Sequence, residues 1–588
     1  MISRNQGANV GLFRQFNPSV HFPFLEKKRT FAQNIYRTIA LQTDKFLVKN
    51  LKRTTNLKQI ILKKRFQNFN LSEKTFFFIS LLLVVYVRLR FADAPFERDE
   101  GEYAYAGMMI LKGELPYRDF YNMKLPGVYY SYAIIFKLFG QSVAVVRYFL
   151  LCLNFLTAFF TFQIARNWLN HKAAYWASGI FLLLSLGFHG QGFIANCEQF
   201  VNVFIAAGFV FLSRKLSLLN LFVGGFFIGV ATLMKQHAFH FALFPIFLLL
   251  KNWLNERNLR AFLSKMTALG FGFALPLTMT VFWIWQKGIF ESFYFFIVQY
   301  ASAYSTLPHT FYENVDNFMN FFEVAVDNML LWLFLFATLF FILKNAKKGL
   351  GTEGSNFAVL FLISFVSICP GFYFRNHYFQ LIFIPSALLI AFGLMNYEAI
   401  AGKLNRYLTR SWFVILSLAV MTAIEIEYFG LKSVDHVTSV IYRYAYFTEM
   451  RQVGEYLKQN VKPSETVGQF GVEPEIWFYA QKRASSGFLY AYPMLENHQF
   501  AAQLIEKFKT ENEKTQPEWF ILQDLTKAEM VSKNLPRLQF WANSFLKNYE
   551  PKAILYANDK LTASFETNFF NIDTTREVIL TVYKRKVF

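Results

Sequence analysis

The chain reads TFFFISLLLVVYVRL from Thr75 to Leu89 and ERDEGEY from Glu97 to Tyr103. The first stretch is predominantly apolar and predicts a helix that lies in lipid. The second combines several carboxylates with an arginine, and such groups are costly to bury and easy to solvate. The sequence therefore predicts a loop at the water–lipid boundary. Asp99 is its strongest candidate for chemistry, and we expect Glu102 to be exposed.

The composition predicts a polytopic α-helical membrane protein. Of 588 residues, 54% are hydrophobic and only 17% are charged, whereas soluble globular proteins carry about 25% charged residues. Apolar windows recur from residue 75 to residue 430, and we interpret them as about 11 transmembrane helices. The first outer loop is large and carries interfacial helices. Its apolar stretch 128–138 is short and broken by tyrosines, which favours an interfacial helix over a span.

The distribution of charge predicts the orientation. The chain carries a net charge of +21, and residues 1–74 hold 15 Lys and Arg against three acids, a net charge of +12. Basic flanks of spans stay in the cytoplasm, so this placement favours a membrane surface over nucleic acid. We predict a basic cytoplasmic segment over 1–74, forming either an amphipathic helix on the membrane or a disordered tail, and a transmembrane domain over 75–430. With the first span leaving the cytoplasm, the first loop lies outside.

The segment 431–588 differs in character, because it carries many charges and alternating apolar segments. We expect a helix over 448–459 and strands over 466–471, 519–523, 553–556 and 578–583. Strands that alternate with helices predict a small α/β domain, and an odd number of spans places it outside the cytoplasm. We expect the protein to lie in the inner (cell) membrane of a bacterium.

The predicted topology gathers polar groups from distant segments on the outer side. These candidates are Asp99, Glu100, Asp119, Lys124, Glu198, Lys235, Arg375, His377 and Tyr378. A carboxylate can take a proton from a hydroxyl, while lysine and arginine stabilise the charge of a phosphate. A lipid-anchored phosphate donor at headgroup level suits such a set. The local alternatives are a turn cap for Asp119 and a structural ion pair between Glu198 and Lys235.

Metal use stays open at this level. Asp99 and Glu198 could hold a divalent ion at an oxygen-rich site, or Lys124, Lys235 and Arg375 could neutralise phosphate without one. The three cysteines lack metal-like spacing. His237 and His240 lie three residues apart, but a structural role is commoner for such a pair.

Several motifs together resemble a known group. They are RDEGEYA at 98–104, GELPYRD at 113–119, KLPG at 124–127, GQS at 140–142 with Arg147, and RNHY at 375–378 before Pro385. This set resembles the polytopic C-type glycosyltransferases, in particular the branch of protein O-mannosyltransferases, aminoarabinose transferases and lipopolysaccharide galacturonosyltransferases. The resemblance covers roughly 75–400. The sequence departs from the family pattern after Lys124, where relatives often have two prolines.

The resemblance implies an activity and roles. A polyprenyl-phosphate sugar donates its sugar, with inversion, to an acceptor hydroxyl on a glycan, a lipid or a protein. Asp99 matches the catalytic aspartate of the family's Asp-Glu motif, Glu100 its neighbour, and Lys124 the lysine near the donor phosphate. The competing interpretations are a transporter or lipid flippase and a noncatalytic scaffold. Polar groups near span ends, rather than at their middle, favour the transferase.

Overall fold

The structure is a computed structural model that describes residues 70–345, 352–442, 446–524, 535–559, 562–567 and 575–587. These residues fall almost entirely in the second of two compact units, Ser72–Phe588. Most of the predicted basic segment 1–74 lies outside the described residues, so the choice between an amphipathic helix and a tail stays a prediction.

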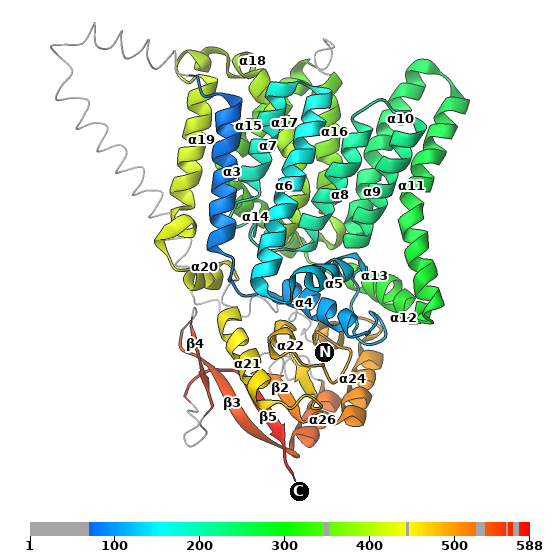
Figure 1. The fold of residues 1–588 in the computed structure, drawn as a ribbon, viewed down its shortest axis with the longest axis vertical. Coiled ribbons are helices and arrows are strands. Elements are labelled where there is room, and N and C mark those ends of the chain that lie inside the picture. The colour runs from blue at the N-terminus through cyan, green and yellow to red at the C-terminus, as the bar shows by residue number, and fades with distance from the viewer. Residues whose placement is uncertain are drawn as a thin grey trace, which may run out of the picture. The chain divides into compact units, whose positions relative to one another are not determined.

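Helices make up the described chain from Glu73 to Ile441 (Figure 1). In order they are α3 (Glu73–Arg90), α4 (Arg98–Leu111), α5 (Gly127–Phe139), α6 (Val143–Trp168), α7 (His171–Leu184), α8 (Cys197–Leu212), α9 (Leu218–Met234), η1 (Gln236–Ala242), α10 (Leu243–Glu256), α11 (Leu259–Gln286), α12 (Phe290–Tyr294), η2 (Phe295–Tyr300), α13 (Ala301–Ser305), α14 (Phe311–Asp327), α15 (Met329–Asn345), α16 (Thr352–Val366), η4 (Pro370–Phe372), η5 (Asn376–Ile382), α17 (Phe383–Met395), α18 (Tyr397–Ala401), η6 (Gly402–Arg406), α19 (Arg410–Ile424), η7 (Glu427–Leu431) and α20 (Val434–Ile441).

Four helical stretches of the described chain are long and apolar enough to cross a membrane: α6, η1 with α10, α11, and η5 with α17. The number rises to six if each of two bent pairs counts as one span, and α8, α9 and 353–366 are apolar but shorter. The chain is thus a multi-pass membrane protein. The predicted count of about 11 is larger because it includes helices shorter than the ~20 residues that a bilayer requires.

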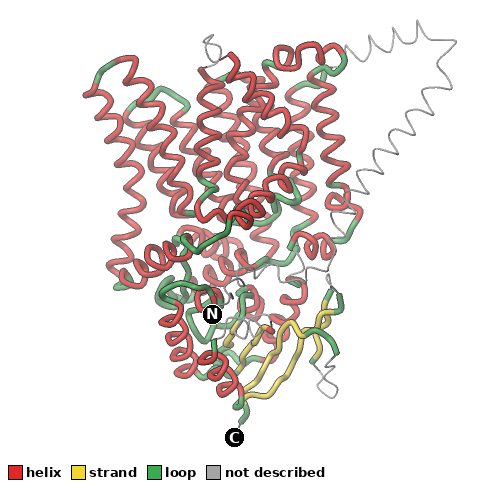
Figure 2. Tube along the Cα trace, turned by 180° about the vertical axis from the view of Figure 1, so that it is seen from behind, coloured by secondary structure: helices red, strands yellow, loops and turns green. Residues whose placement is uncertain are grey.

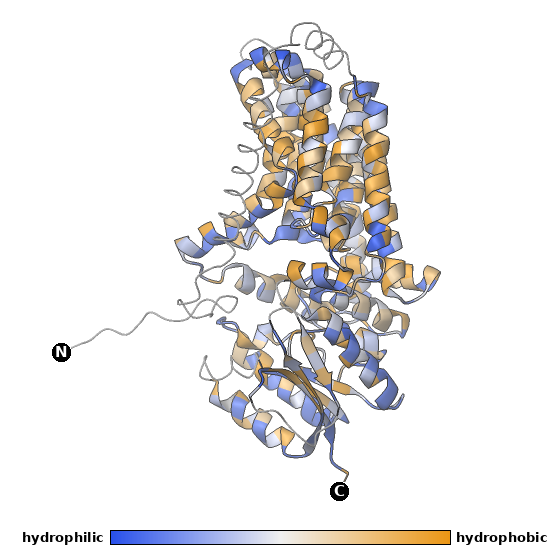
Figure 3. Cartoon of the chain, turned by 90° about the vertical axis from the view of Figure 1, so that its left-hand side faces the viewer, coloured by the Kyte–Doolittle hydropathy of each residue, from blue (hydrophilic) through white to orange (hydrophobic). Residues whose placement is uncertain are grey.

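The long helices carry the apolar surface expected of a lipid-facing bundle. Figure 3 shows the bundle mostly in the hydrophobic colour, whereas the part that holds the strands is mixed. On α11, Phe271, Met279 and Phe282 are each more than half exposed. The segment 128–138 forms most of α5, which has 13 residues and packs on α4 and α6. Its length is too short for a span, in agreement with the interfacial interpretation.

The segment after α20 holds all strands of the described chain (Figure 2). Its elements are α21 (Phe447–Asn460), β1 (Val467–Phe470), α22 (Glu475–Ala480), α23 (Tyr492–Leu495), α24 (Ala501–Thr515), β2 (Trp519–Gln523), α26 (Pro536–Leu546), β3 (Tyr549–Ala557), β4 (Ala563–Glu566) and β5 (Val578–Arg585). The sheet has the order β1-β2-β5-β3-β4; β1 and β2 are parallel and the other pairs antiparallel. The four predicted strands and the predicted helix are present. The sequence missed β4, a four-residue edge strand that is only partly buried.

The sheet-bearing segment packs closely against α4. A side chain at Gly101 would bring a Cβ within 2.5 Å of Glu475 Cβ, so this approach of α4 to α22 requires glycine. Arg98, three residues before Gly101, forms a bidentate ion pair with Glu473, and its Nη2 lies 2.7 Å from Glu473 Oε1. Planar pairs of this kind fix orientation as well as distance.

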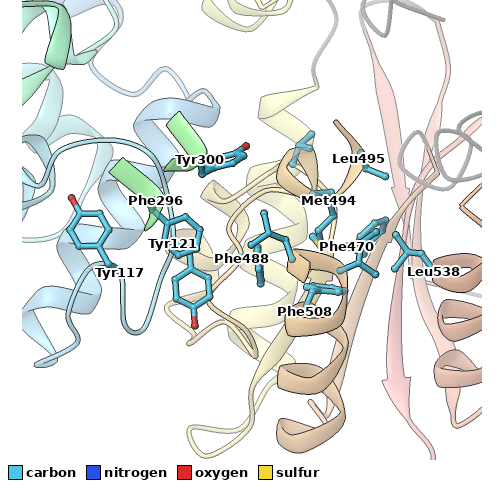
Figure 4. Packing of buried hydrophobic residues seen from close by; sticks show 14 of the residues in the cluster. Tyr117, Tyr121, Phe296, Tyr300, Phe470, Phe488, Met494, Leu495, Phe508 and Leu538 are labelled. Atoms are coloured by element: carbon cyan, nitrogen blue, oxygen red, sulfur yellow. The ribbon is translucent and has the colours of Figure 1, made fainter. Parts of the chain in front are cut away.

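An apolar cluster adds to this contact (Figure 4). Tyr121 of the loop after α4 stacks on Phe296 of η2, with ring centroids 4.9 Å apart. Its ring also meets Phe488 edge-on, and its backbone N–H donates to the carbonyl of Gly487. The loop that carries the predicted site is therefore held from two sides, by η2 and by the C-terminal segment.

Candidate functional site

Asp99 lies in the first turn of α4, not in a loop. Glu97 caps this helix, because its side chain accepts the backbone N–H of Glu100. Carboxylates in a first turn also interact favourably with the positive end of the helix dipole. The predicted loop over 97–103 is thus wrong: the same charges that exclude this stretch from lipid make it a good helix start.

Lys124 joins two carboxylates of that helix. Its Nζ lies 2.8 Å from Asp99 Oδ1 and 2.7 Å from Glu102 Oε2. Asp99 and Glu102 are three positions apart, and this spacing places them on one helix face. Glu102 was expected to be exposed, and this is wrong, since its side chain is fully buried. The tyrosine hydroxyls of Tyr129 and Tyr490 also donate to it, which offsets the cost of burial.

A second ion pair faces the first. Glu198 lies in the first turn of α8 and Lys235 directly follows α9, and Lys235 Nζ donates to Glu198 Oε1. His377 lies between the two pairs, with its Nε2 4.0 Å from both Asp99 Oδ2 and Glu198 Oε1. Lys235 Nζ also lies 3.7 Å from the centre of the Tyr378 ring. We call the group Asp99, Glu102, Lys124, Glu198, Lys235 and His377 the carboxylate–lysine cluster.

Burial and neighbouring charges shift the pKa values of the cluster residues. Burial by itself would raise the pKa of Asp99, but the ammonium of Lys124 and the nearby His377 and Arg375 hold that pKa well below its ordinary value. Burial would lower the pKa of Lys124, and the two carboxylates instead raise it above its ordinary value. For Glu102, burial dominates and raises the pKa. Asp99 is therefore the ionised carboxylate beside a charged lysine.

The remaining predicted residues are placed differently. Asp119 accepts the N–H of Leu115 and pairs with Arg118, so its contacts are those of a turn. Arg375 donates to the hydroxyl of Tyr304 at 3.3 Å, and its charge acts on Asp99.

Glu100 does not face Lys124. It is fully buried, pairs with Arg147 through both carboxylate oxygens, and accepts the N–H of Ala195 at 2.6 Å. These contacts suit a residue that positions α4 against α6 and the loop before α8. Its catalytic role stays a prediction.

The sequence missed the contribution of the C-terminal segment. Tyr490 donates to Glu102 Oε2 at 2.9 Å and to the carbonyl of Arg98 at 3.1 Å. A tyrosine hundreds of residues from the motif carries no local signal of this contact. Glu102, in contrast, could have been found, because its spacing of three from Asp99 predicts a shared face.

Metal-ligating groups occur elsewhere in the described chain. Ligand atoms of His189, Asp327 and Glu425 lie within 4.8 Å of one another. In the cluster around Asp99, by contrast, Lys124 and Lys235 already neutralise Asp99 and Glu198. His240 Nδ1 lies 3.0 Å from the carbonyl of His237, a contact within one turn.

Comparisons with known proteins agree with the sequence resemblance. Residues 124–285, which include Lys124, Glu198 and Lys235, match the family of dolichyl-phosphate-mannose-protein mannosyltransferases. No curated protein is significantly similar in sequence. The fold is similar to that of ArnT from Cupriavidus metallidurans bound to undecaprenyl phosphate, with a TM-score of 0.54, 14% identity, and coverage of 86% of this chain and 97% of ArnT.

The same protein in the apo state gives a TM-score of 0.53 at 15% identity, with the same coverage of both chains. At this level of identity the likeness concerns the fold. The chain thus has a fold similar to that of ArnT, and its residues 124–285 match the dolichyl-phosphate-mannose-protein mannosyltransferase family.

Proposed function

We propose that the chain is an integral membrane glycosyltransferase that moves a sugar from a polyprenyl-phosphate-linked donor to an acceptor hydroxyl, with inversion at the anomeric carbon. One observation carries this proposal: Lys124 lies between Asp99 and Glu102, with Lys235, His377 and Arg375 around them. A candidate base beside several cations is what attack on a sugar and departure of a phosphate require. The family match and the ArnT-like fold support it.

The reaction assigns one role to each group. The acceptor oxygen forms a bond to the anomeric carbon while the bond from that carbon to the phosphate oxygen breaks. Asp99 takes the proton of the acceptor hydroxyl. Lys124 and Arg375 stabilise the polyprenyl phosphate that leaves. Lys235, His377 and Tyr378 border the opposite side, where they bind donor or acceptor oxygens, and Glu198 holds Lys235 in place.

The pairing of Asp99 with Lys124 adds a step. A carboxylate whose pKa is depressed is a weak base. A donor phosphate that takes the Lys124 ammonium weakens the interaction which depresses that pKa. Binding of the donor thereby raises the basicity of Asp99 at the moment when the acceptor requires it.

The topology belongs to the same proposal. A cytoplasmic N-terminus, about 11 spans and a C-terminal domain from residue 431 place the cluster on the outer side of a bacterial inner membrane. Cysteines introduced at exposed Asp93 and exposed Tyr407 test it, because the two positions would lie on opposite sides. Labelling of both by one impermeant reagent in intact cells would contradict this orientation.

The experiment uses the purified full chain with a panel of polyprenyl-phosphate sugars and mixed envelope glycans, lipids and proteins as acceptors. We expect a covalent glycosylated product in mass spectra and its loss in Asp99→Asn. Asp93→Asn is the matched control, since Asp93 is exposed and lies six residues before Asp99. Movement of the donor across proteoliposomes without any covalent product would support a flippase instead.

A further inference from the structure

A second group of titratable side chains lies outside the carboxylate–lysine cluster. His189 lies in the loop after α7, Asp327 ends α14, and Glu425 follows α19. One ligand atom from each lies within 4.8 Å of the other two. Three segments distant in sequence thus bring one imidazole and two carboxylates to a single point.

Both carboxylates of this group are buried, and one of their oxygens lacks a partner among the described residues. Asp327 and Glu425 are 1% and 3% exposed, whereas the His189 side chain retains 23%. Glu425 Oε1 accepts the N–H of Phe188, but Oε2 is buried and has no hydrogen-bond partner in the described chain. The nearby cation Arg88 donates instead to Asn154 and to the carbonyl of Ser185. His189 Nδ1 lies 2.5 Å from Asp327 Oδ1 and partly compensates that carboxylate. Glu425 beside it has no such partner in the part of the chain that the structure describes, and a buried carboxylate without full compensation is costly.

We propose that His189, Asp327 and Glu425 bind a divalent transition-metal ion of the Zn²⁺ or Mn²⁺ type. An imidazole nitrogen with two carboxylate oxygens suits these ions better than Mg²⁺ or Ca²⁺, which prefer oxygen alone. The partly exposed His189 provides the route of entry, and three protein ligands leave room for water. The ion occupies the unpartnered side of Glu425 and neutralises both carboxylates.

The ion has a structural consequence, because its ligands hold the loop between α7 and α8. Asp327 Oδ2 accepts the N–H groups of His189 and Gly190. The backbone passes so close that a Cβ on Gly187 would lie 2.4 Å from that oxygen. An ion on Asp327 thus fixes the start of the loop.

Further along, the same loop reaches the first site. Gln191 Oε1 lies 3.2 Å from His377 Nδ1, and the N–H of Ala195 donates to Glu100. The ion is therefore a positioning element for His377 and Glu100. This inference does not depend on glycosyl transfer.

The test measures metal directly on the full chain, purified without a polyhistidine tag. After dialysis against Zn²⁺ or Mn²⁺, elemental analysis of the wild type should give about one bound ion per chain. Co²⁺ in its place should produce visible absorption bands of a nitrogen–oxygen site. His189→Ala and Glu425→Gln should each lower the occupancy at least tenfold. Wild-type protein that binds none of the three ions would overturn the proposal.

Matched variants separate this site from the first cluster. Asp99→Asn and Glu198→Gln should keep the ion, as should His436→Ala, a histidine on α20. The ion should also raise the unfolding temperature of the wild type in detergent and leave that of His189→Ala unchanged. If His189→Ala does not fold, His189→Gln provides the same measurement with a side chain closer in size to histidine. Loss of the ion in Asp99→Asn together with its retention in His189→Ala would place the metal elsewhere.

Discussion

Lys124 Nζ lies 2.8 Å from Asp99 Oδ1, so the strongest candidate base and the strongest candidate phosphate ligand are paired with each other. Two consequences follow from this pair. Asp99 is ionised at rest, and Lys124 must leave or share it when a donor phosphate arrives. The paired arrangement is thus the resting state of the site, and binding of a donor phosphate should separate Lys124 from Asp99.

Removal of the candidate base should abolish transfer without preventing donor binding. Because general-base catalysis contributes about 10²–10⁴-fold, Asp99→Asn should lower kcat by that order. Donor affinity should stay the same or rise, since Lys124 loses a competing carboxylate. Single-turnover assays and direct binding of the donor measure the two effects. Equal losses of transfer in Asp99→Asn and Asp93→Asn would contradict the role of Asp99.

Lys124→Met should weaken donor binding more than the chemical step. A charge-assisted contact to phosphate contributes about 1.5–3 kcal/mol, which corresponds to roughly tenfold or more in Kd. Titration of the lipid-phosphate donor at several salt concentrations measures this loss. Lys137→Met, an exposed lysine on α5, is the control. Unchanged Kd in Lys124→Met would remove the lysine from the donor site.

The pKa of Asp99 predicts how stability depends on pH. That pKa is lower in the folded chain than the value of about 3.9 in an unfolded one. The stabilisation is therefore fully present above the unfolded pKa and is lost as the pH falls through the lower, folded value. Unfolding temperatures of the wild type and Asp99→Asn should differ by a constant amount from pH 8 to pH 5. A difference that vanishes within that range would contradict the depressed pKa.

The buried pair of Glu100 and Arg147 should matter for folding. Breaking a buried pair by removing one partner costs about 3–5 kcal/mol, because the other charge stays buried and unpaired. Arg147→Met should therefore lower the yield of folded protein strongly. The double variant Glu100→Gln with Arg147→Met should recover part of it. Thermal unfolding of the wild type, of Arg147→Met, of Glu100→Gln and of the double variant measures the coupling, and purely additive losses would contradict the pairing.

Tyr490 should couple the C-terminal segment to the cluster. Tyr490→Phe removes the hydroxyl that donates to Glu102 and to the carbonyl of Arg98. A hydrogen bond to a charged group contributes about 1.5–3 kcal/mol, so stability and kcat should both fall. Tyr456→Phe, whose ring packs on Phe565, is the control for loss of a hydroxyl. Wild-type activity in Tyr490→Phe would show that the C-terminal segment does not support the site.

The sequence predicted the secondary-structure elements of the molecule better than the contacts between individual residues. Apolar runs predicted a helical membrane part, because lipid requires such runs. Alternating apolar residues predicted four strands of the sheet. The edge strand β4 escaped, since its burial is weak. The predicted count of about 11 spans stays a prediction beyond the four to six candidates of the described chain, because an apolar run alone does not tell a full span from a shorter buried helix.

By itself the sequence determined the membrane class and most of the residues from which the site is drawn. These depend on local properties: hydrophobicity, charge and spacing along one element. Only the tertiary structure decided that Lys124 joins Asp99 to Glu102, that His377 lies between two ion pairs, and that Tyr490 reaches the cluster. It also brought together His189, Asp327 and Glu425. The reason is physical: such contacts join elements up to several hundred residues apart, and their geometry is set by packing between elements.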